Sequence, residues 1–79
     1  MSMPKKITVT PNKESWRLAP SGGAKAPDTN FRTQRRAAEV GKKELSRQGG
    51  GELAVKGRGG AVREQNTVPP ARDPRRSKG

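Results

Sequence analysis

Two stretches near the start of the chain alternate apolar and polar residues with the period of a β-strand. Ile7 and Val9 alternate with polar side chains, and Pro11 ends the run because proline cannot donate to a continuing strand ladder. Trp16 and Leu18 alternate in the same way after a short polar turn. The two runs predict a first β-hairpin with these four apolar side chains on one face.

The middle of the chain changes to the spacing of an amphipathic helix, from Thr33 to Gln48. An apolar stripe is formed by Ala37, Ala38, Gly41 and Leu45, which Phe31 could extend from the loop side, while the opposite side is charged. Thr33 is a suitable N-cap, and the glycines after Gln48 can end the helix in a left-handed conformation. Gly41 has two interpretations: it lets the helix approach the sheet closely, or it is a tolerated glycine that costs about 1 kcal/mol relative to alanine.

A second hairpin is predicted over residues 52–67, around a glycine-rich turn at residues 57–60. Leu53 and Val55 alternate with other residues before the turn, and Val62 restarts the alternation after it. If the alternation is regular, these three side chains all point to the same side of the sheet. We therefore expect them to face the helix.

The order of these elements predicts an α+β domain, β-β-α-β-β, in which one helix packs on a small antiparallel sheet. Residues 20–28 lack a period and predict a loop that is long enough to be mobile. Residues 6–67 form the single domain, residues 1–5 a flexible N-terminus, and residues 68–79 a disordered basic tail rich in proline and arginine. Because only 27% of the 79 residues are hydrophobic, the core is small and such a chain often needs a second copy or a ligand.

Several short motifs, in their order and spacing, resemble one bacterial family. They are Val9-x-Pro11-Asn12, then Trp16-x-Leu18, the helix led by Thr33, Glu52-Leu53-Ala54-Val55, and Gly57-Arg58-Gly59-Gly60-Ala61-Val62-Arg63-Glu64. The chain resembles domain-of-unknown-function family 2188, whose members usually carry acids early in the helix where this chain has Arg35 and Arg36. The family has no established activity, cofactor or catalytic residue. The resemblance therefore implies a fold and not a function.

Charge is the strongest feature of the composition. Lysine and arginine number 18 against 7 aspartate and glutamate, which gives a formal net charge of +11. A balance of this kind favours polyanionic partners such as nucleic acid or an acidic protein surface. No apolar run approaches the roughly 20 residues that a membrane span needs, and the first residues do not form a signal peptide. We expect a cytoplasmic protein without a membrane partner.

The amino-acid composition excludes most kinds of enzyme catalysis. The chain has neither cysteine nor histidine, which excludes disulfides, thiolate and imidazole catalysis and the usual zinc sites. The carboxylates are scattered among basic residues, and the glycine-rich segments lack the ending of a phosphate loop. We expect a protein that is not an enzyme, with no cofactor, no metal and no small-molecule substrate.

Nine cations on the predicted open sheet face, the helix, the second turn and the tail are candidates for contacts with nucleic acid. They are Lys6, Arg17, Arg35, Arg36, Lys56, Arg58, Arg63, Arg75 and Arg76. Such residues predict binding to the phosphate backbone of DNA or RNA with little sequence specificity. The only aromatic residues, Trp16 and Phe31, are assigned to the core, so no platform for base stacking is predicted.

The same sequence is compatible with a structural or protein-interaction module. In that hypothesis the open sheet face or an edge strand pairs with a second copy, giving a homodimer, or with an acidic protein partner. A third interpretation is that the positive face is only solvated. Binding to nucleic acid that weakens steeply with salt distinguishes the first hypothesis from the other two.

Overall fold

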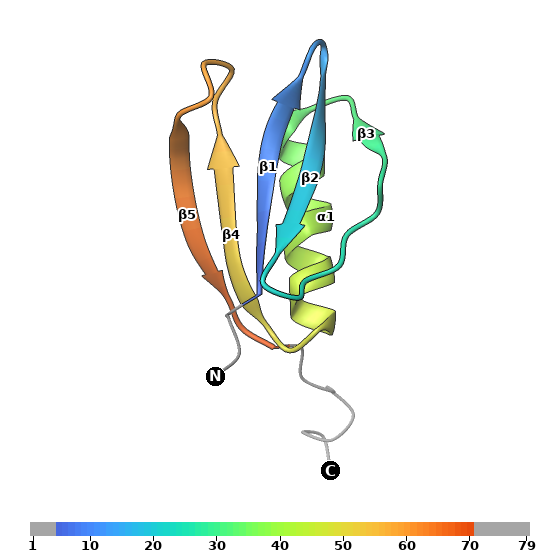
Figure 1. Ribbon diagram of the computed structural model, residues 1–79, viewed down its shortest axis with the longest axis vertical. Coiled ribbons are helices and arrows are strands. Elements are labelled where there is room, and N and C mark those ends of the chain that lie inside the picture. Colours follow the sequence, from blue (N-terminus) through green and yellow to red (C-terminus); the bar gives the residue numbers. More distant parts are fainter. Residues whose placement is uncertain (1–4, 71–79) are drawn as a thin grey trace.

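The computed structural model describes residues 5–70 and shows a five-stranded sheet with one helix on one of its faces (Figure 1). The elements are β1 (Lys6–Asn12), β2 (Ser15–Ser21), β3 (Asn30–Phe31), α1 (Gln34–Arg47), β4 (Gly51–Lys56) and β5 (Val62–Val68). The strand order is β3-β2-β1-β4-β5. This confirms the predicted α+β class and adds a short strand, β3, before the helix.

The sheet is mixed, and the prediction of a wholly antiparallel sheet is wrong for one pair of strands. β1 and β4 run parallel, while the other three pairs are antiparallel. α1 runs back along the sheet in the direction opposite to β1, so the strand that follows it starts at the same end as β1 (Figure 1). Because β2 already occupies one edge of β1, β4 pairs with the other edge.

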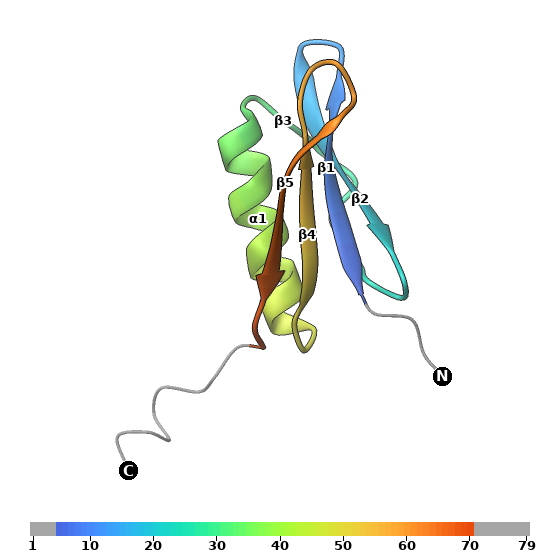
Figure 2. The same cartoon turned by 90° about the vertical axis from the view of Figure 1, so that its left-hand side faces the viewer.

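The core lies between α1 and the side of the sheet that faces it (Figure 2). Ile7, Val9 and Leu53 from the sheet and Leu45 from the helix are fully buried. Burial of each such side chain contributes roughly 1.5–3 kcal/mol. A Cβ atom on Gly41 would lie only 2.8 Å from Leu53 Cδ1, so the helix approaches β4 closely there. Of the two interpretations of this glycine, the close approach is therefore the right one.

The ends of α1 agree with the sequence pattern. Thr33 Oγ1 accepts a hydrogen bond of 3.1 Å from the backbone N–H of Arg36, and Gly49 follows the C-cap with a φ of 103°. The C-cap residue, Gln48, also binds the preceding loop: its side chain accepts from the N–H of Lys25 at 2.8 Å and donates to its C=O at 2.7 Å. The loop that was predicted to be mobile is held at this point by two hydrogen bonds.

A β-bulge in β5 changes the direction of the side chains that precede it. Val55 pairs with Glu64 and the next residue, Lys56, pairs with Val62, so Arg63 has no residue opposite it. The extra residue turns Val62 to the side of Lys56, where 53% of it is exposed. The prediction that Val62 faces the helix is therefore wrong, because it assumed a regular alternation through the strand.

Two residues predicted to lie just outside the domain make contacts with it. Val68, predicted as the first residue of the tail, is the buried last residue of β5. Lys5, assigned to the flexible N-terminus, donates from Nζ to the backbone oxygen of Gln48 at 2.8 Å. The remainder of the predicted flexible start and most of the basic tail lie outside the described residues.

Candidate nucleic-acid interface

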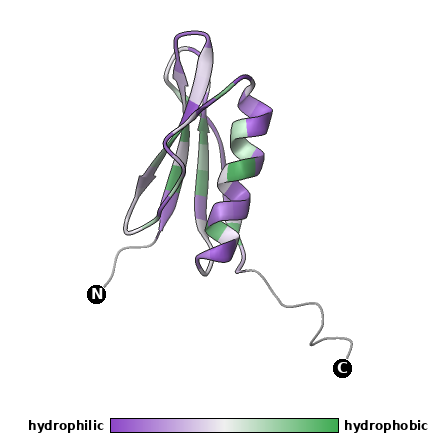
Figure 3. Ribbon diagram, turned by 90° about the vertical axis from the view of Figure 1, so that its right-hand side faces the viewer, coloured by the Kyte–Doolittle hydropathy of each residue, from purple (hydrophilic) through white to green (hydrophobic). Residues whose placement is uncertain are grey.

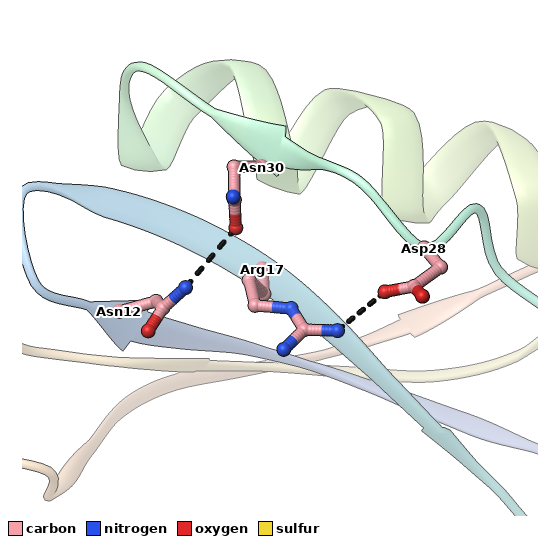
Figure 4. A network of polar contacts seen from close by, with 4 residues as sticks. All are labelled: Asn12, Arg17, Asp28 and Asn30. Carbon is pink, nitrogen blue, oxygen red and sulfur yellow. Dashed lines mark hydrogen bonds and ion pairs between the residues drawn. The ribbon is translucent and has the colours of Figure 1, made fainter.

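The open face of the sheet carries three of the predicted contact residues, and two of them lie beside a carboxylate. Lys6 of β1 lies next to Glu52 in the parallel register with β4. The Arg17 guanidinium of β2 donates to the carboxylate of Asp28 (Figure 4). Lys56 is the third cation, and its partner across the bulge is the uncharged Val62. Three cations and two carboxylates leave this face close to neutral.

The pair of Arg17 and Asp28 belongs to a small network that attaches the loop before β3 to the first hairpin. Asn12 Nδ2 donates to Asn30 Oδ1 at 3.1 Å in the same network (Figure 4). The side chains of Arg17 and Asp28 are 47% and 85% exposed, so the ion pair contributes only about 0.2–1 kcal/mol. The network nevertheless occupies the Arg17 guanidinium, which does not project alone from the sheet.

Arg58, predicted to contact phosphate from the tip of the second turn, folds back onto the protein. Its guanidinium carbon lies 4.6 Å from the centre of the Trp16 ring, and its Nη1 donates to the backbone oxygen of Lys13. These contacts join the β4–β5 turn to the β1–β2 turn, which lie at the same end of the molecule (Figure 1). Arg58 thus closes the end of the core at which Trp16 is buried.

Arg63 is the extra residue of the bulge and has no residue opposite it on β4. Its Cδ lies 2.7 Å from the position that a Cβ on Gly57 would take, so its side chain crosses that glycine. The bulge places Val62, and not Arg63, opposite Lys56. Of the predicted quartet of strand cations, Lys6, Arg17 and Lys56 thus have a register partner on a neighbouring strand and Arg63 does not.

The largest group of cations lies on the outer side of α1 and on the residue just before its N-cap. Figure 3 shows hydrophilic segments, in purple, along this helix beside hydrophobic ones. We call this group of cations the basic helix face; its members, all exposed, are Arg32, Arg35, Arg36, Lys42, Lys43 and Arg47. Two carboxylates lie on the same helix: Glu39 is 3.8 Å from Arg35, and Glu44 is 3.5 Å from Arg47. Six cations against two acids make this side strongly positive.

Four members of the basic helix face have no carboxylate within 4 Å among residues 5–70: Arg32, Arg36, Lys42 and Lys43. Arg36 and Lys43 lie two turns apart, about 10 Å along the axis, and line the same open hollow on the helix surface together with Glu39 and Val40. The 14 residues of α1 span about 21 Å, a length over which duplex DNA carries roughly a dozen phosphates. The face therefore has the length and charge to contact several phosphates at once.

The structure does not bring the predicted contact residues onto one surface. Seven are described: Lys6, Arg17 and Lys56 lie on the open sheet face, Arg35 and Arg36 on the basic helix face, Arg58 on Trp16, and Arg63 against Gly57. Arg75 and Arg76 lie outside the described residues. The predicted set omits Lys42 and Lys43, although their positions opposite the stripe of Ala37, Gly41 and Leu45 place them on the same outer side.

Little else in the described part of the chain suggests a chemical site. Among residues 5–70 there is no group of three or more metal-ligating side chains, and no polar or charged residue is buried. No helix in that range is long and apolar enough to cross a membrane. The exposed cations are the feature of this surface that suggests a partner.

Comparison with known proteins agrees with the fold. The family described as "Uncharacterized protein conserved in bacteria (DUF2188)" matches residues 7–68, from the first core residue of β1 to the last residue of β5. No curated protein and no solved structure matches the chain. The match covers most of the chain and confirms the resemblance drawn from the sequence motifs. The chain belongs to this family of uncharacterized bacterial proteins.

Proposed function

We propose that this protein binds nucleic acid through the phosphate backbone, as a non-enzymatic cytoplasmic protein, and that the basic helix face makes the principal contacts. The observation that carries the proposal is the group of four exposed cations, Arg32, Arg36, Lys42 and Lys43, without a carboxylate within 4 Å in the described chain. Cations that form no ion pair can exchange their counterions for phosphates without first losing a carboxylate partner.

The first turn of α1 supports the same surface. It contains no acidic residue, so the positive end of the helix dipole is flanked by Arg35 and Arg36 rather than balanced by a carboxylate. A phosphate near this end relieves the repulsion between these charges and the helix dipole. Arginine can bind a phosphate with two parallel hydrogen bonds, whereas lysine contributes a point charge.

The burial of the aromatic residues bears on which nucleic acids bind. Trp16 is 6% exposed and Phe31 is half-buried against the core, so neither forms an open platform for unpaired bases. The proposal is therefore backbone binding with little dependence on sequence.

The test is a fluorescence anisotropy titration of the full chain with labelled duplex DNA, duplex RNA and single-stranded DNA, at salt concentrations from about 50 to 300 mM. Four to six phosphate contacts predict a slope of log affinity against log salt of about −4 to −5 for duplex DNA, and similar affinities for unrelated sequences. Glutamine at Arg75 and Arg76 in the same assay measures the part contributed by the tail. Absence of binding at the lowest salt would contradict the proposal.

A further inference from the structure

β5 is a long, exposed edge strand at one end of the sheet. It has seven residues, six of them exposed, whereas the strand at the opposite edge, β3, has only two residues. Figure 2 looks onto this edge, where no other element of the described chain lies against the outer side of β5. The N–H and C=O groups that point outward from an edge strand are free to pair with another strand.

β5 carries few of the features that prevent such pairing. A bulge at Arg63 disturbs its start, and prolines follow its end, but Glu64–Val68 is regular and contains no lysine and no proline. The helix does not cover this strand, since Glu64 and Asn66 are exposed although they pair with the buried Val55 and Leu53. Five residues of regular strand are therefore available to a partner.

We propose that two copies of this chain pair antiparallel through β5, about a two-fold axis that passes through Gln65. In this register Gln65 lies opposite its own copy, and Glu64 lies opposite Asn66 on both sides of the axis. The Asn66 amide can donate to the Glu64 carboxylate of the other copy, a charge-assisted hydrogen bond. The strand is thus complementary to itself in charge and hydrogen bonding.

The other antiparallel registers in which paired residues lie on the same face of the joined sheet are less favourable. A centre at Glu64 places two carboxylates opposite each other, and a centre at Asn66 places Glu64 opposite the apolar Val68. A centre at Thr67 brings Pro69 opposite Gln65, and proline cannot donate to the ladder. Side-chain chemistry therefore selects the register centred on Gln65.

Pairing about this axis joins two five-stranded sheets and keeps both helices on the same side. Because α1 packs mainly on β1 and β4, the two helices lie about four strand spacings apart, roughly 19 Å. Two basic helix faces then meet one polyanion; this consequence, unlike the pairing itself, rests on the proposed function. Repulsion between copies of net charge +11 opposes pairing at low salt, and added salt screens it.

Sedimentation equilibrium of the full chain, without nucleic acid, tests the pairing separately from the proposed function. We expect a monomer–dimer equilibrium whose dissociation constant falls as salt rises, the opposite sign to nucleic-acid binding. Gln65→Lys places two lysines opposite each other and should weaken self-association by about tenfold or more. Ala19→Lys, an exposed residue of β2, adds the same charge away from the edge and should leave it unchanged. A monomer at every salt up to several hundred micromolar protein overturns the pairing, whatever the titration with DNA shows.

Cysteine cross-linking tests the register, since the natural chain contains no cysteine. In the proposed pair the Cα atoms at position 65 lie about 4.5–5.5 Å apart, within the range of a disulfide. Those at position 66 lie about 8 Å apart, beyond that range. Gln65→Cys should therefore form a disulfide-linked dimer under mild oxidation, and Asn66→Cys should not. Efficient cross-linking of Asn66→Cys with none at position 65 overturns this register.

Discussion

The open face of the sheet and the basic helix face both carry cations, but they differ in how many of these cations are exposed and unpaired. On the sheet, Lys6 has Glu52 as its neighbour and Arg17 binds Asp28. Two of the three sheet cations, Lys6 and Lys56, have no carboxylate within 4 Å in the described part of the chain, and the same holds for four of the six helix cations. Lys6 and Lys56 are half-buried, whereas all six helix cations are exposed. The two faces therefore differ in the number and exposure of their unpaired cations, and not in the fraction that is unpaired.

The residues that lie beside a charged side chain are determined differently on a strand and on a helix. A side chain on a strand lies about 4.5–5.5 Å from one on the next strand, which comes from another part of the sequence. In this way Glu52 of β4 is brought to Lys6 of β1. A side chain on the outer side of a helix meets mainly residues three and four positions away. The charge of the basic helix face is consequently set by the local sequence of α1.

The largest effect on stability is expected from a comparison of a buried residue of the sheet with an exposed one. Leu53 is fully buried under the helix and Val62 is 53% exposed, although the sequence pattern predicts that both face the core. Leu53→Ala should cost about 2–5 kcal/mol of unfolding free energy, enough to unfold much of so small a domain. Val62→Ala should change it by about 0.5 kcal/mol or less. Urea denaturation measures both, and similar losses would contradict the position of Val62.

A smaller effect is expected at Arg58, which belongs to neither cationic face. Arg58→Ala removes the cation over Trp16 and the hydrogen bond to Lys13, which together should cost about 1–2 kcal/mol. Arg58→Lys keeps the charge but loses the planar guanidinium, so it should recover only part of the stability. Neither variant should change the salt dependence of nucleic-acid binding. If the slope of log affinity against log salt fell by one unit while stability stayed unchanged, Arg58 would contact phosphate instead.

The smallest effect on stability is expected from a substitution at Asp28, which alters the charge of the open sheet face alone. Asp28→Asn leaves Arg17 without its carboxylate and should change stability by less than about 1 kcal/mol, because the pair is exposed. If the sheet face takes no part in binding, affinity for duplex DNA should rise by about twofold or less. An increase of about eightfold at 0.1 M salt, the value of one full phosphate contact, would place this face in the interface.

The features that were predictable from the sequence are those that depend on local signals. The helix ends follow from Thr33 and the glycines after Gln48, and the apolar stripe around Gly41 follows from the helical period. The pairing of β1 with β4 was not predictable, because alternation marks a strand without naming its neighbour. The bulge at Arg63 was likewise hidden, and it alone reversed the direction of Val62.

The candidate site shows the same division. The period of α1 is sufficient to place Arg35 and Arg36 on the outer side, and it places Lys42 and Lys43 there as well. Arg58 could not be assigned to Trp16 from the sequence, since that contact joins two turns that are more than forty residues apart. Charges on strands and turns required the tertiary structure, whereas charges on the helix did not.

The most direct test of nucleic-acid binding by the basic helix face compares two full-chain variants that each lose three positive charges. One has glutamine at Arg36, Lys42 and Lys43 on the basic helix face, and the other has glutamine at Lys6, Arg17 and Lys56 on the open sheet face. The measurement is the salt dependence of binding to duplex DNA, with urea denaturation to confirm that both variants are folded. The helix variant should lose about 2.7 units of slope and, at 0.1 M salt, about 500-fold in affinity, while the sheet variant should lose less than about one unit. Equal losses in the two variants, or a larger loss in the sheet variant, would contradict the assignment of binding to the helix.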